Sequence, residues 1–164
     1  MREKGKGEMQ LLLRNFLWAG IFLGLLWGAA GGIAAGQERE VFELRKFQWK
    51  NRILLIFAPS AEDPARKSLV AELNTQVAGV RERDLLIGEF FEVGANQFAG
   101  ASLTPESAEA LRRQFAVRKG MPTVILVGKD GEVKLRREGP VQAAEIFALI
   151  DSMPMRQKEM GERK

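Results

Sequence analysis

The chain of 164 residues contains no cysteine, no histidine and no tyrosine. Without cysteine it cannot form a disulfide, a peroxide-reducing thiolate or a thiolate zinc site. Without histidine it lacks the commonest metal ligand and the usual general base of nucleophilic catalysis. The sequence therefore excludes thiol oxidoreductases and hydrolases of the serine–histidine or cysteine–histidine type, and we predict neither a cofactor nor a metal.

The chain also lacks a large excess of charge of either sign. The 25 lysine and arginine residues are nearly balanced by 21 aspartate and glutamate residues, which gives a formal net charge of +4. Nucleic-acid-binding domains carry a concentrated basic stripe, which this chain lacks, so we predict no nucleic-acid partner. No P-loop, zincin or EF-hand motif is present either.

The first 36 residues have the pattern of a secretory signal peptide. Residues 15–37 carry no charge, and within them an apolar stretch at 16–27 is followed by small residues up to Gly36. An uncleaved anchor formed by residues 15–36 is the alternative, because the uncharged stretch is just long enough to span a bilayer. Both interpretations place the domain outside the cytoplasm, periplasmic or secreted, with membrane contact only through a retained leader.

The rest of the chain reads as one α/β domain at residues 52–152, preceded by an opening segment at 37–51 and followed by a polar tail at 153–164. Continuous apolar runs predict buried strands, and an Asp-Gly pair between two strand patterns predicts a hairpin. The predicted strands cover residues 52–58, 84–93 (with a bulge near Gly88), 123–127 and 133–137.

Helix signals alternate with these strands. Asp63-Pro64 and Thr104-Pro105 each suit an N-cap followed by a first helical residue. We expect the first helix to end at Gly79 and the last to begin at Gly139-Pro140, with a loop at 94–103. The resulting order is β-α-β-α-β-β-α, in which the early β-α-β units predict parallel neighbours and the late hairpin an antiparallel edge.

This order, with Pro122 directly before the third strand, resembles the thioredoxin-like fold: three α/β/α layers around a mixed sheet. In thioredoxins the corresponding loop carries a cis-proline, so the resemblance makes Pro122 a candidate for a cis peptide bond. Thioredoxins and peroxiredoxins place their reactive cysteine just after the first strand. Here that place holds Pro59-Ser60-Ala61-Glu62-Asp63-Pro64, which cannot replace a thiolate.

Four strings together resemble the domain of unknown function 4174 family over about residues 40–160. They are Trp49-Lys50-Asn51-Arg52, Glu82-Arg83-Asp84, Gly128 to Arg136, and Ile150 to Arg156. The resemblance implies a peroxiredoxin-like fold in exported bacterial proteins and animal extracellular matrix proteins. It implies no established activity.

Several polar groups are candidates for binding. Glu82, Arg83 and Asp84 are expected to form ion pairs with Arg136 or Lys134. Lys129 and Asp130 lie at the hairpin tip, where they either meet a ligand or serve the turn. The full set of candidates is Arg83, Asp84, Lys129, Asp130, Arg136, Met153, Met155 and Arg156.

Three functions remain open from the sequence. The favoured one is a non-catalytic binding or scaffold module that holds a protein partner in the cell envelope. It would use either the loop face around Ser60, Asp63 and Pro122 or the tail that contains Met155. The alternatives are an enzyme that uses Glu62 or Asp63 with Lys129 or Arg136, and an envelope stress or metal protein that uses the thioethers of the tail.

Overall fold

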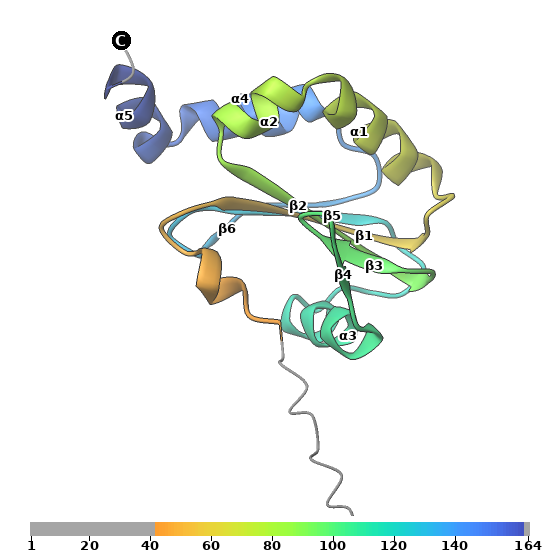
Figure 1. Ribbon diagram of the computed structural model, residues 1–164. Helices are drawn as coiled ribbons and strands as arrows, with labels where there is room; N and C mark the ends of the chain where they lie inside the picture. The colour runs from red at the N-terminus through yellow and green to blue at the C-terminus, as the bar shows by residue number, and fades with distance from the viewer. Residues whose placement is uncertain (1–41, 163–164) are drawn as a thin grey trace, which may run out of the picture. The chain divides into compact units, whose positions relative to one another are not determined.

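The computed structural model describes residues 42–162, which form a six-stranded mixed sheet with helices on both faces (Figure 1). The predicted signal peptide lies outside the described residues. The strands, in the sheet order β4-β3-β2-β1-β5-β6, are β1 (Arg52–Ser60), β2 (Leu85–Val93), β3 (Asn96–Phe98), β4 (Ala101–Leu103), β5 (Thr123–Val127) and β6 (Val133–Glu138). The helices are the 3-10 turn η1 (Leu44–Phe47), α1 (Pro64–Thr75), α2 (Val77–Glu82), α3 (Pro105–Gln114), α4 (Ala143–Ser152) and α5 (Pro154–Glu162).

Strand β1 is central because its side chains are apolar on both faces, as its continuous apolar sequence predicts. It runs parallel to β2 and antiparallel to β5, and Phe57 lies opposite Phe90 on one side and Thr123 on the other. The strand continues past its predicted end at 58 to Ser60. Since β5 pairs with β1 only as far as Phe57, Pro59 lies where one side of β1 has no ladder partner, and proline is tolerated there.

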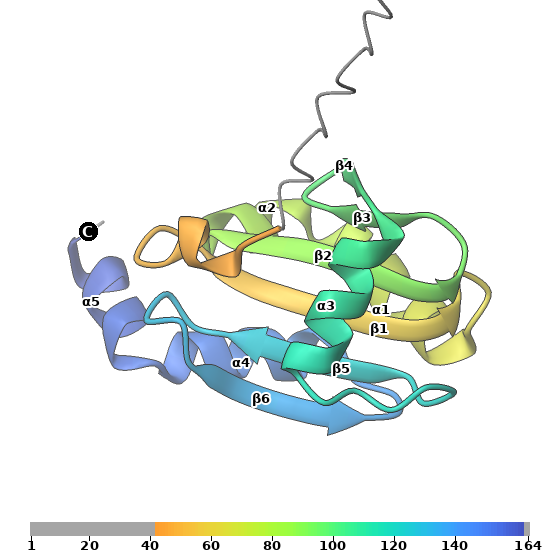
Figure 2. The same ribbon diagram turned by 90° about the horizontal axis from the view of Figure 1, so that it is seen from below.

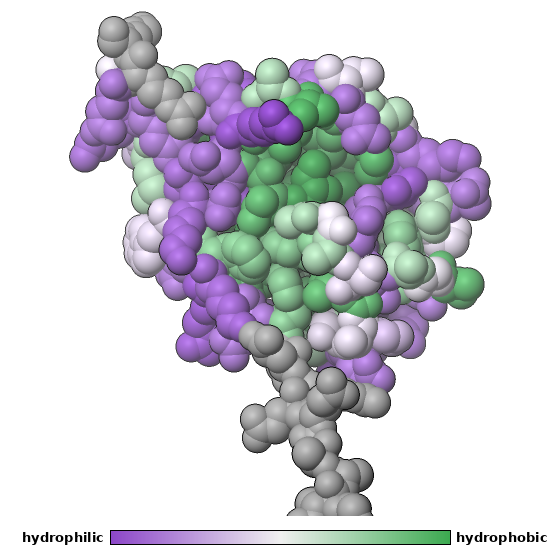
Figure 3. Space-filling model, viewed as in Figure 1, coloured by the Kyte–Doolittle hydropathy of each residue, from purple (hydrophilic) through white to green (hydrophobic). Residues whose placement is uncertain are grey.

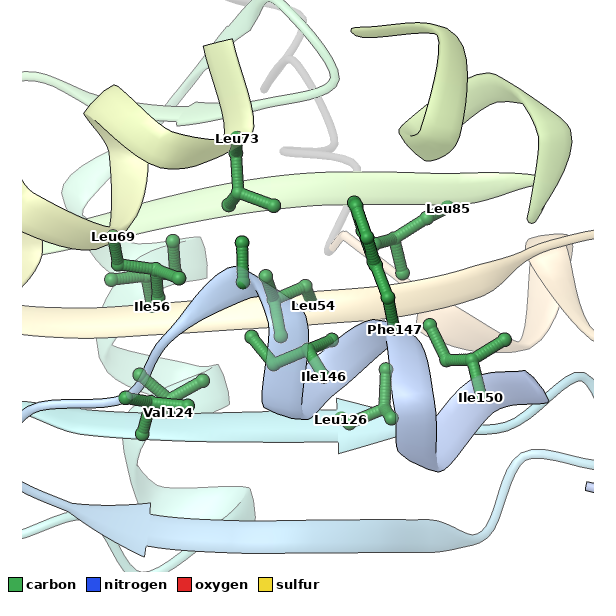
Figure 4. Close-up of a cluster of buried hydrophobic side chains, with 12 residues drawn as sticks. Leu54, Ile56, Leu69, Leu73, Leu85, Val124, Leu126, Ile146, Phe147 and Ile150 are labelled. Atoms are coloured by element: carbon green, nitrogen blue, oxygen red, sulfur yellow. The ribbon is translucent and has the colours of Figure 1, made fainter. Parts of the chain in front are cut away.

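The helices form two layers, and this confirms the predicted α/β/α arrangement. Helices α1, α2 and α4 cover one face of the sheet, and α3 lies on the other with η1 (Figures 1 and 2). On the first face, α1 and α4 pack on β1 and β5 through the core cluster of Figure 4, where Leu54, Ile146 and Ile150 are fully buried. On the second face, Phe42 and Phe47 pack on Phe98, as expected for an opening segment that covers the edge of the core.

The region between β2 and α3 differs from the prediction. The expected loop at 94–103 contains the short hairpin β3–β4, whose three-residue strands are too brief to give a periodic signal. The bulge expected near Gly88 is absent from β2, because Leu55 pairs with Gly88 in unbroken register. Glycine is needed there for space: a Cβ atom would lie 2.8 Å from the rings of Phe90 and Phe98.

Helix boundaries show how contacts distant in sequence override local signals. Gly79 does not end a helix but lies within α2, where an added Cβ atom would approach the Phe147 ring to 3.1 Å. Helix α4 begins at Ala143 instead of at Gly139-Pro140. The Glu72 carboxylate of α1 accepts a 2.8 Å hydrogen bond from the Ala143 backbone N–H, and so caps α4 from another helix.

Three further features differ from what the sequence led us to expect. The expected polar tail at 153–164 contains the helix α5, which begins with Pro154 in its first turn. The second β-α-β unit, β2-α3-β5, does not give parallel neighbours. Its connection places β5 on the side of β1 away from β2, where β5 pairs antiparallel with β1. The Met121–Pro122 bond is trans, like every peptide bond in residues 42–162. The Pro122 carbonyl oxygen accepts a 2.8 Å hydrogen bond from the N–H of Gly139, which follows β6, and this bond extends the pairing of β5 with β6.

Candidate functional site

The turn after β1, where a thioredoxin-like enzyme holds its thiol, is built from groups that stabilise the turn itself. The Asp63 carboxylate accepts a 2.9 Å hydrogen bond from the Arg66 N–H, which confirms the predicted N-cap of α1. The Ser60 hydroxyl accepts a 3.3 Å hydrogen bond from the Glu62 N–H. Both side chains therefore accept hydrogen bonds from backbone N–H groups of the same turn.

A buried ion pair that sequence reasoning missed lies next to this turn. Glu89 of β2 is only 6% exposed, and the Arg66 guanidinium reaches its Oε2 from Nε at 2.5 Å. Gln97 of β3 donates to the other carboxylate oxygen at 2.6 Å. The one sequence signal was a charge in the middle of a strand that is otherwise apolar up to Glu92 near its end. Both oxygens of Glu89 thus accept hydrogen bonds from neighbouring side chains, and its charge is paired with the Arg66 guanidinium.

The opposite end of the sheet carries a larger ionic network, centred on Glu159 of α5. The Arg52 side chain is 1% exposed and donates to both oxygens of Glu159 at 3.1 Å. The Lys129 Nζ atom, 11% exposed as a side chain, lies 2.8 Å from Glu159 and 2.9 Å from Asp84. Burial disfavours the charged form of Glu159, but the hydrogen bonds from Arg52 and Lys129 outweigh it and lower its pKa below 4.5.

Arg156 anchors the other half of this network. It is fully buried and donates to the Glu82 backbone carbonyl at 3.0 Å, to the Glu82 carboxylate at 2.7 Å and to Asp151 at 3.2 Å. Asp151 also pairs with Arg83 at 2.5 Å. Burial again disfavours the charged carboxylate, but the two arginines outweigh it and hold the pKa of Asp151 below 3.8.

The structure therefore brings together four predicted binding candidates, Arg83, Asp84, Lys129 and Arg156, but with partners other than those expected. Arg136 instead donates to the backbone carbonyls of Phe115 and Ala116. The partners differ from those predicted: Glu82 pairs with Arg156 of α5 and Asp84 with Lys129 of the hairpin turn, whereas the cation Arg83 pairs with Asp151 of α4.

The polar side chains of the hairpin between β5 and β6 bind one another and stabilise its turn. Lys134 pairs with Asp130 at 2.6 Å and with Glu132 at 2.8 Å. Asp130 accepts from the Glu132 N–H at 3.0 Å, and Gly131 has φ +85°, the left-handed conformation that the Asp-Gly sequence predicts. Burial raises the pKa of Asp130, but the hydrogen bonds from Lys134 and Glu132 reverse the effect and lower it.

The remaining candidates, Met153 and Met155, lie at the junction of α4 and α5. Met153 packs against the core, whereas Met155 is 38% exposed, and both line a cavity of about 300 Å³ together with Lys129 and Asp130. Within residues 42–162 no group of three or more acidic side chains could hold a metal ion.

The carboxylates and cations of the predicted enzyme site do not meet. Asp63 follows the carboxyl end of β1, whereas Lys129 follows β5, which runs antiparallel, and therefore lies near the amino end of β1. A nine-residue strand separates the two ends by about 26 Å at 3.3 Å per residue. The pairing expected between Glu62 or Asp63 and Lys129 is absent, and Glu62 pairs with Lys67 instead.

An apolar groove lies between α1, β2 and the β3–β4 hairpin. Its volume is about 350 Å³, and Figure 3 shows apolar side chains gathered on this face between α1 and β2. Strand β3 pairs only with Gly88 and Glu89, so the outer side of β2 at Leu85 and Leu86 has no neighbouring strand in the described part of the chain. The groove is lined by Val70, Leu73, Asn74, Leu85, Leu86, Ile87, Glu89, Gln97, Ala99 and Gly100.

The element order and sheet topology define a thioredoxin-like domain. The reduced 2-Cys peroxiredoxin of Plasmodium vivax matches with a TM-score of 0.53 at 15% identity, over 70% of this chain and 84% of that chain. Plasmodium yoelii thioredoxin peroxidase I matches with a TM-score of 0.52 at 16% identity, over 70% and 79%. At such identities the likeness shows the fold alone, and this chain has no cysteine.

The chain belongs to the family described as "Domain of unknown function (DUF4174)", whose model matches residues 43–159. Coiled-coil domain-containing protein 80 of Danio rerio is 29% identical over 134 residues, which cover 72% of this chain and 16% of the relative. Sushi repeat-containing protein SRPX2 of Xenopus laevis is 26% identical over 122 residues, which cover 71% of this chain and 26% of the relative. The chain thus spans about a quarter or less of the length of these curated relatives.

Proposed function

We propose that this chain is an exported, non-catalytic protein-binding module of the cell envelope. One observation carries the proposal. After β1, where thioredoxin-like enzymes hold their thiol, this chain has no cysteine, and its polar groups bind one another: Asp63 caps α1 and Arg66 pairs with Glu89. A fold kept without its reactive group retains its surface as the functional part. The relatives agree with such a role, because in them the matching region is a small part of a longer protein.

The binding surface is the apolar groove beside β2. The two edges of the sheet differ. The edge strand β6 exposes Arg136 and Arg137, and charged side chains on an edge discourage pairing with another strand. Beside Leu85 and Leu86 the edge is apolar and open, and it is flanked by the α1 side chain Val70. An extended segment of a partner protein fits such an edge, because its backbone adds to the sheet while alternate apolar side chains enter the groove.

The location outside the cytoplasm rests on the uncharged stretch at 15–37 and its basic flank. None of the helices within residues 42–162 has the length and apolar character needed to cross a bilayer. Mass spectrometry of the protein recovered from the cell envelope tests the location. A mature N-terminus near residue 37 is the expected result, and a cytoplasmic full-length chain would contradict it.

Site-specific photo-crosslinking tests the groove. A crosslinking residue at Asn74, on the exposed rim, is expected to capture a partner, whereas one at Ala148, exposed on α4 outside the groove, is not. Introducing Val70→Glu should abolish the adduct, and the captured segment should protect the outward-pointing Leu85 amide from hydrogen exchange. Equal adducts at both positions, or capture that survives Val70→Glu, would count against this surface.

A further inference from the structure

A second cavity, on the other face of the sheet, lies between the end of β2 and α3. Its volume is about 720 Å³, within the range of small-ligand sites. Its walls are partly apolar, through Phe91, Val93, Pro105 and Ala108. Val93 is 75% exposed at the end of its strand, a large apolar side chain with no core function.

Arg112 of α3 lies in the wall of this cavity in an unusual state. Its side chain is 4% exposed, yet its Nη1 atom is buried without a hydrogen-bond partner. Its one hydrogen bond, from Nη2 to the Phe90 carbonyl, is long at 3.5 Å. The nearest carboxylates, Glu92 and Glu109, stand at 3.9 and 3.8 Å, beyond hydrogen-bond distance.

The lack of any short hydrogen bond sets Arg112 apart from the other buried arginines. Arg52, although its Nε also lacks a partner, and Arg156 each donate several hydrogen bonds near 3 Å to carboxylates and carbonyls. A buried guanidinium with unfilled donors is unfavourable, and one that borders an open cavity gains most from an incoming acceptor. Glu92 does not fill this role, because its Oε1 accepts a 2.6 Å hydrogen bond from the Gly120 N–H.

We propose that this cavity binds a carboxylate attached to an apolar group. The planar guanidinium of Arg112 matches a carboxylate in a two-pronged geometry, and Lys119 adds a second positive charge to the lining. Glu92 and Glu109 balance these cations, so a singly charged anion is tolerated better than a doubly charged phosphate. The apolar walls accept the remainder of the ligand.

A carboxylate of this kind is carried by a small apolar acid or by the C-terminus of a peptide. Amide chemical shifts of the natural, processed protein would be followed by NMR during titration with hexanoate, with an acetylated Ala-Leu dipeptide and with its C-terminal amide. Saturable shifts at residues 91–94 and 105–112 are expected for the free acids. Binding of the dipeptide but not of hexanoate assigns a peptide C-terminus, and the reverse assigns a small acid.

Variants then locate the contact. Arg112→Lys keeps the charge but not the planar fork and should weaken binding at least about 10-fold. Lys119→Ala, on an exposed residue, should weaken it about 2- to 5-fold without affecting folding. The control is Arg113→Ala, which removes the neighbouring, 70% exposed arginine and should leave affinity unchanged.

Three results would overturn the proposal. One is the absence of saturable binding for every free carboxylate up to about 10 mM. The second is equal binding of the amide or of inorganic phosphate, which would show that the carboxylate is not what is recognised. The third is affinity that Lys119→Ala and Arg112→Lys both leave unchanged. Because this cavity lies apart from the groove beside β2, its failure would leave the proposed binding module intact.

Discussion

The variant Glu159→Gln tests the ionic network beneath α5. It keeps the size and one oxygen acceptor of the side chain but removes the negative charge that faces Arg52 and Lys129. Arg52 has no other carboxylate within the ion pairs of the described residues, so its charge is left with two neutral acceptors, the new amide oxygen and the Arg83 carbonyl at 3.0 Å. Lys129 retains Asp84, so the loss falls mainly on Arg52.

The size of this loss in stability follows from the burial of the Arg52–Glu159 pair. Breaking a buried ion pair by removing one partner costs about 3–5 kcal/mol, because the remaining charge is left without compensation. Glu159 is 18% exposed as a side chain, which favours the lower end, about 3 kcal/mol. For a domain of roughly 120 residues the unfolding entropy is about 250 cal/mol/K, so the melting temperature should fall by about 12 °C.

Calorimetry and urea unfolding would measure the loss. The matched control is Glu62→Gln, which removes an exposed carboxylate from a pair with Lys67 and should leave the melting temperature unchanged. The double variant Arg52→Met with Glu159→Leu replaces both charges and should recover most of the stability. A Glu159→Gln protein as stable as the wild type would show that α5 does not hold the domain together through this pair.

Three further predictions concern stability. The lowered pKa values of Asp151 and Glu159 mean that their contribution is complete above their ordinary values of 3.8 and 4.5 and is lost as the pH falls through the lowered ones. The stability difference between wild type and Glu159→Gln should therefore shrink below about pH 4.5, and urea midpoints that stay equally far apart down to pH 2.5 would contradict it. Asp63→Ala should cost about 1 kcal/mol by loss of the α1 cap, whereas Asp63→Asn should keep most of that stability in urea unfolding. Gly88→Ala should cost about 1–3 kcal/mol, because its Cβ atom meets the Phe90 and Phe98 rings, and the combination with Phe98→Leu should relieve part of the loss.

The parts of the fold that could be predicted from the sequence are those that rest on local signals. The continuous apolar run of β1 and the Asp-Pro and Thr-Pro starts of α1 and α3 predict elements that the structure confirms. Helix α5 was missed for a physical reason. Its buried side consists of Arg156 and Glu159, which are buried only because Arg52, Glu82 and Asp151 neutralise them.

The same reason limited the prediction of sites. Four of the charged candidates lie in one ionic network, but the sequence gives no rule for pairing an acid in one segment with a cation some 70 to 107 positions away. The Arg66–Glu89 pair and the unfilled Arg112 guanidinium depend on side-chain positions in three dimensions. Only the charge of Glu89 in the middle of a mainly apolar strand pointed to the first of them.

The network beneath α5 also ties distant parts of the chain to one another. Arg52 opens the first strand and its partner Glu159 lies 107 positions later, in α5. When α5 detaches, the Arg52 guanidinium loses its counter-charge, so a local opening of this helix is felt at the central strand. A ligand or partner that pulled α5 away would therefore loosen the middle of the sheet and not only its margin.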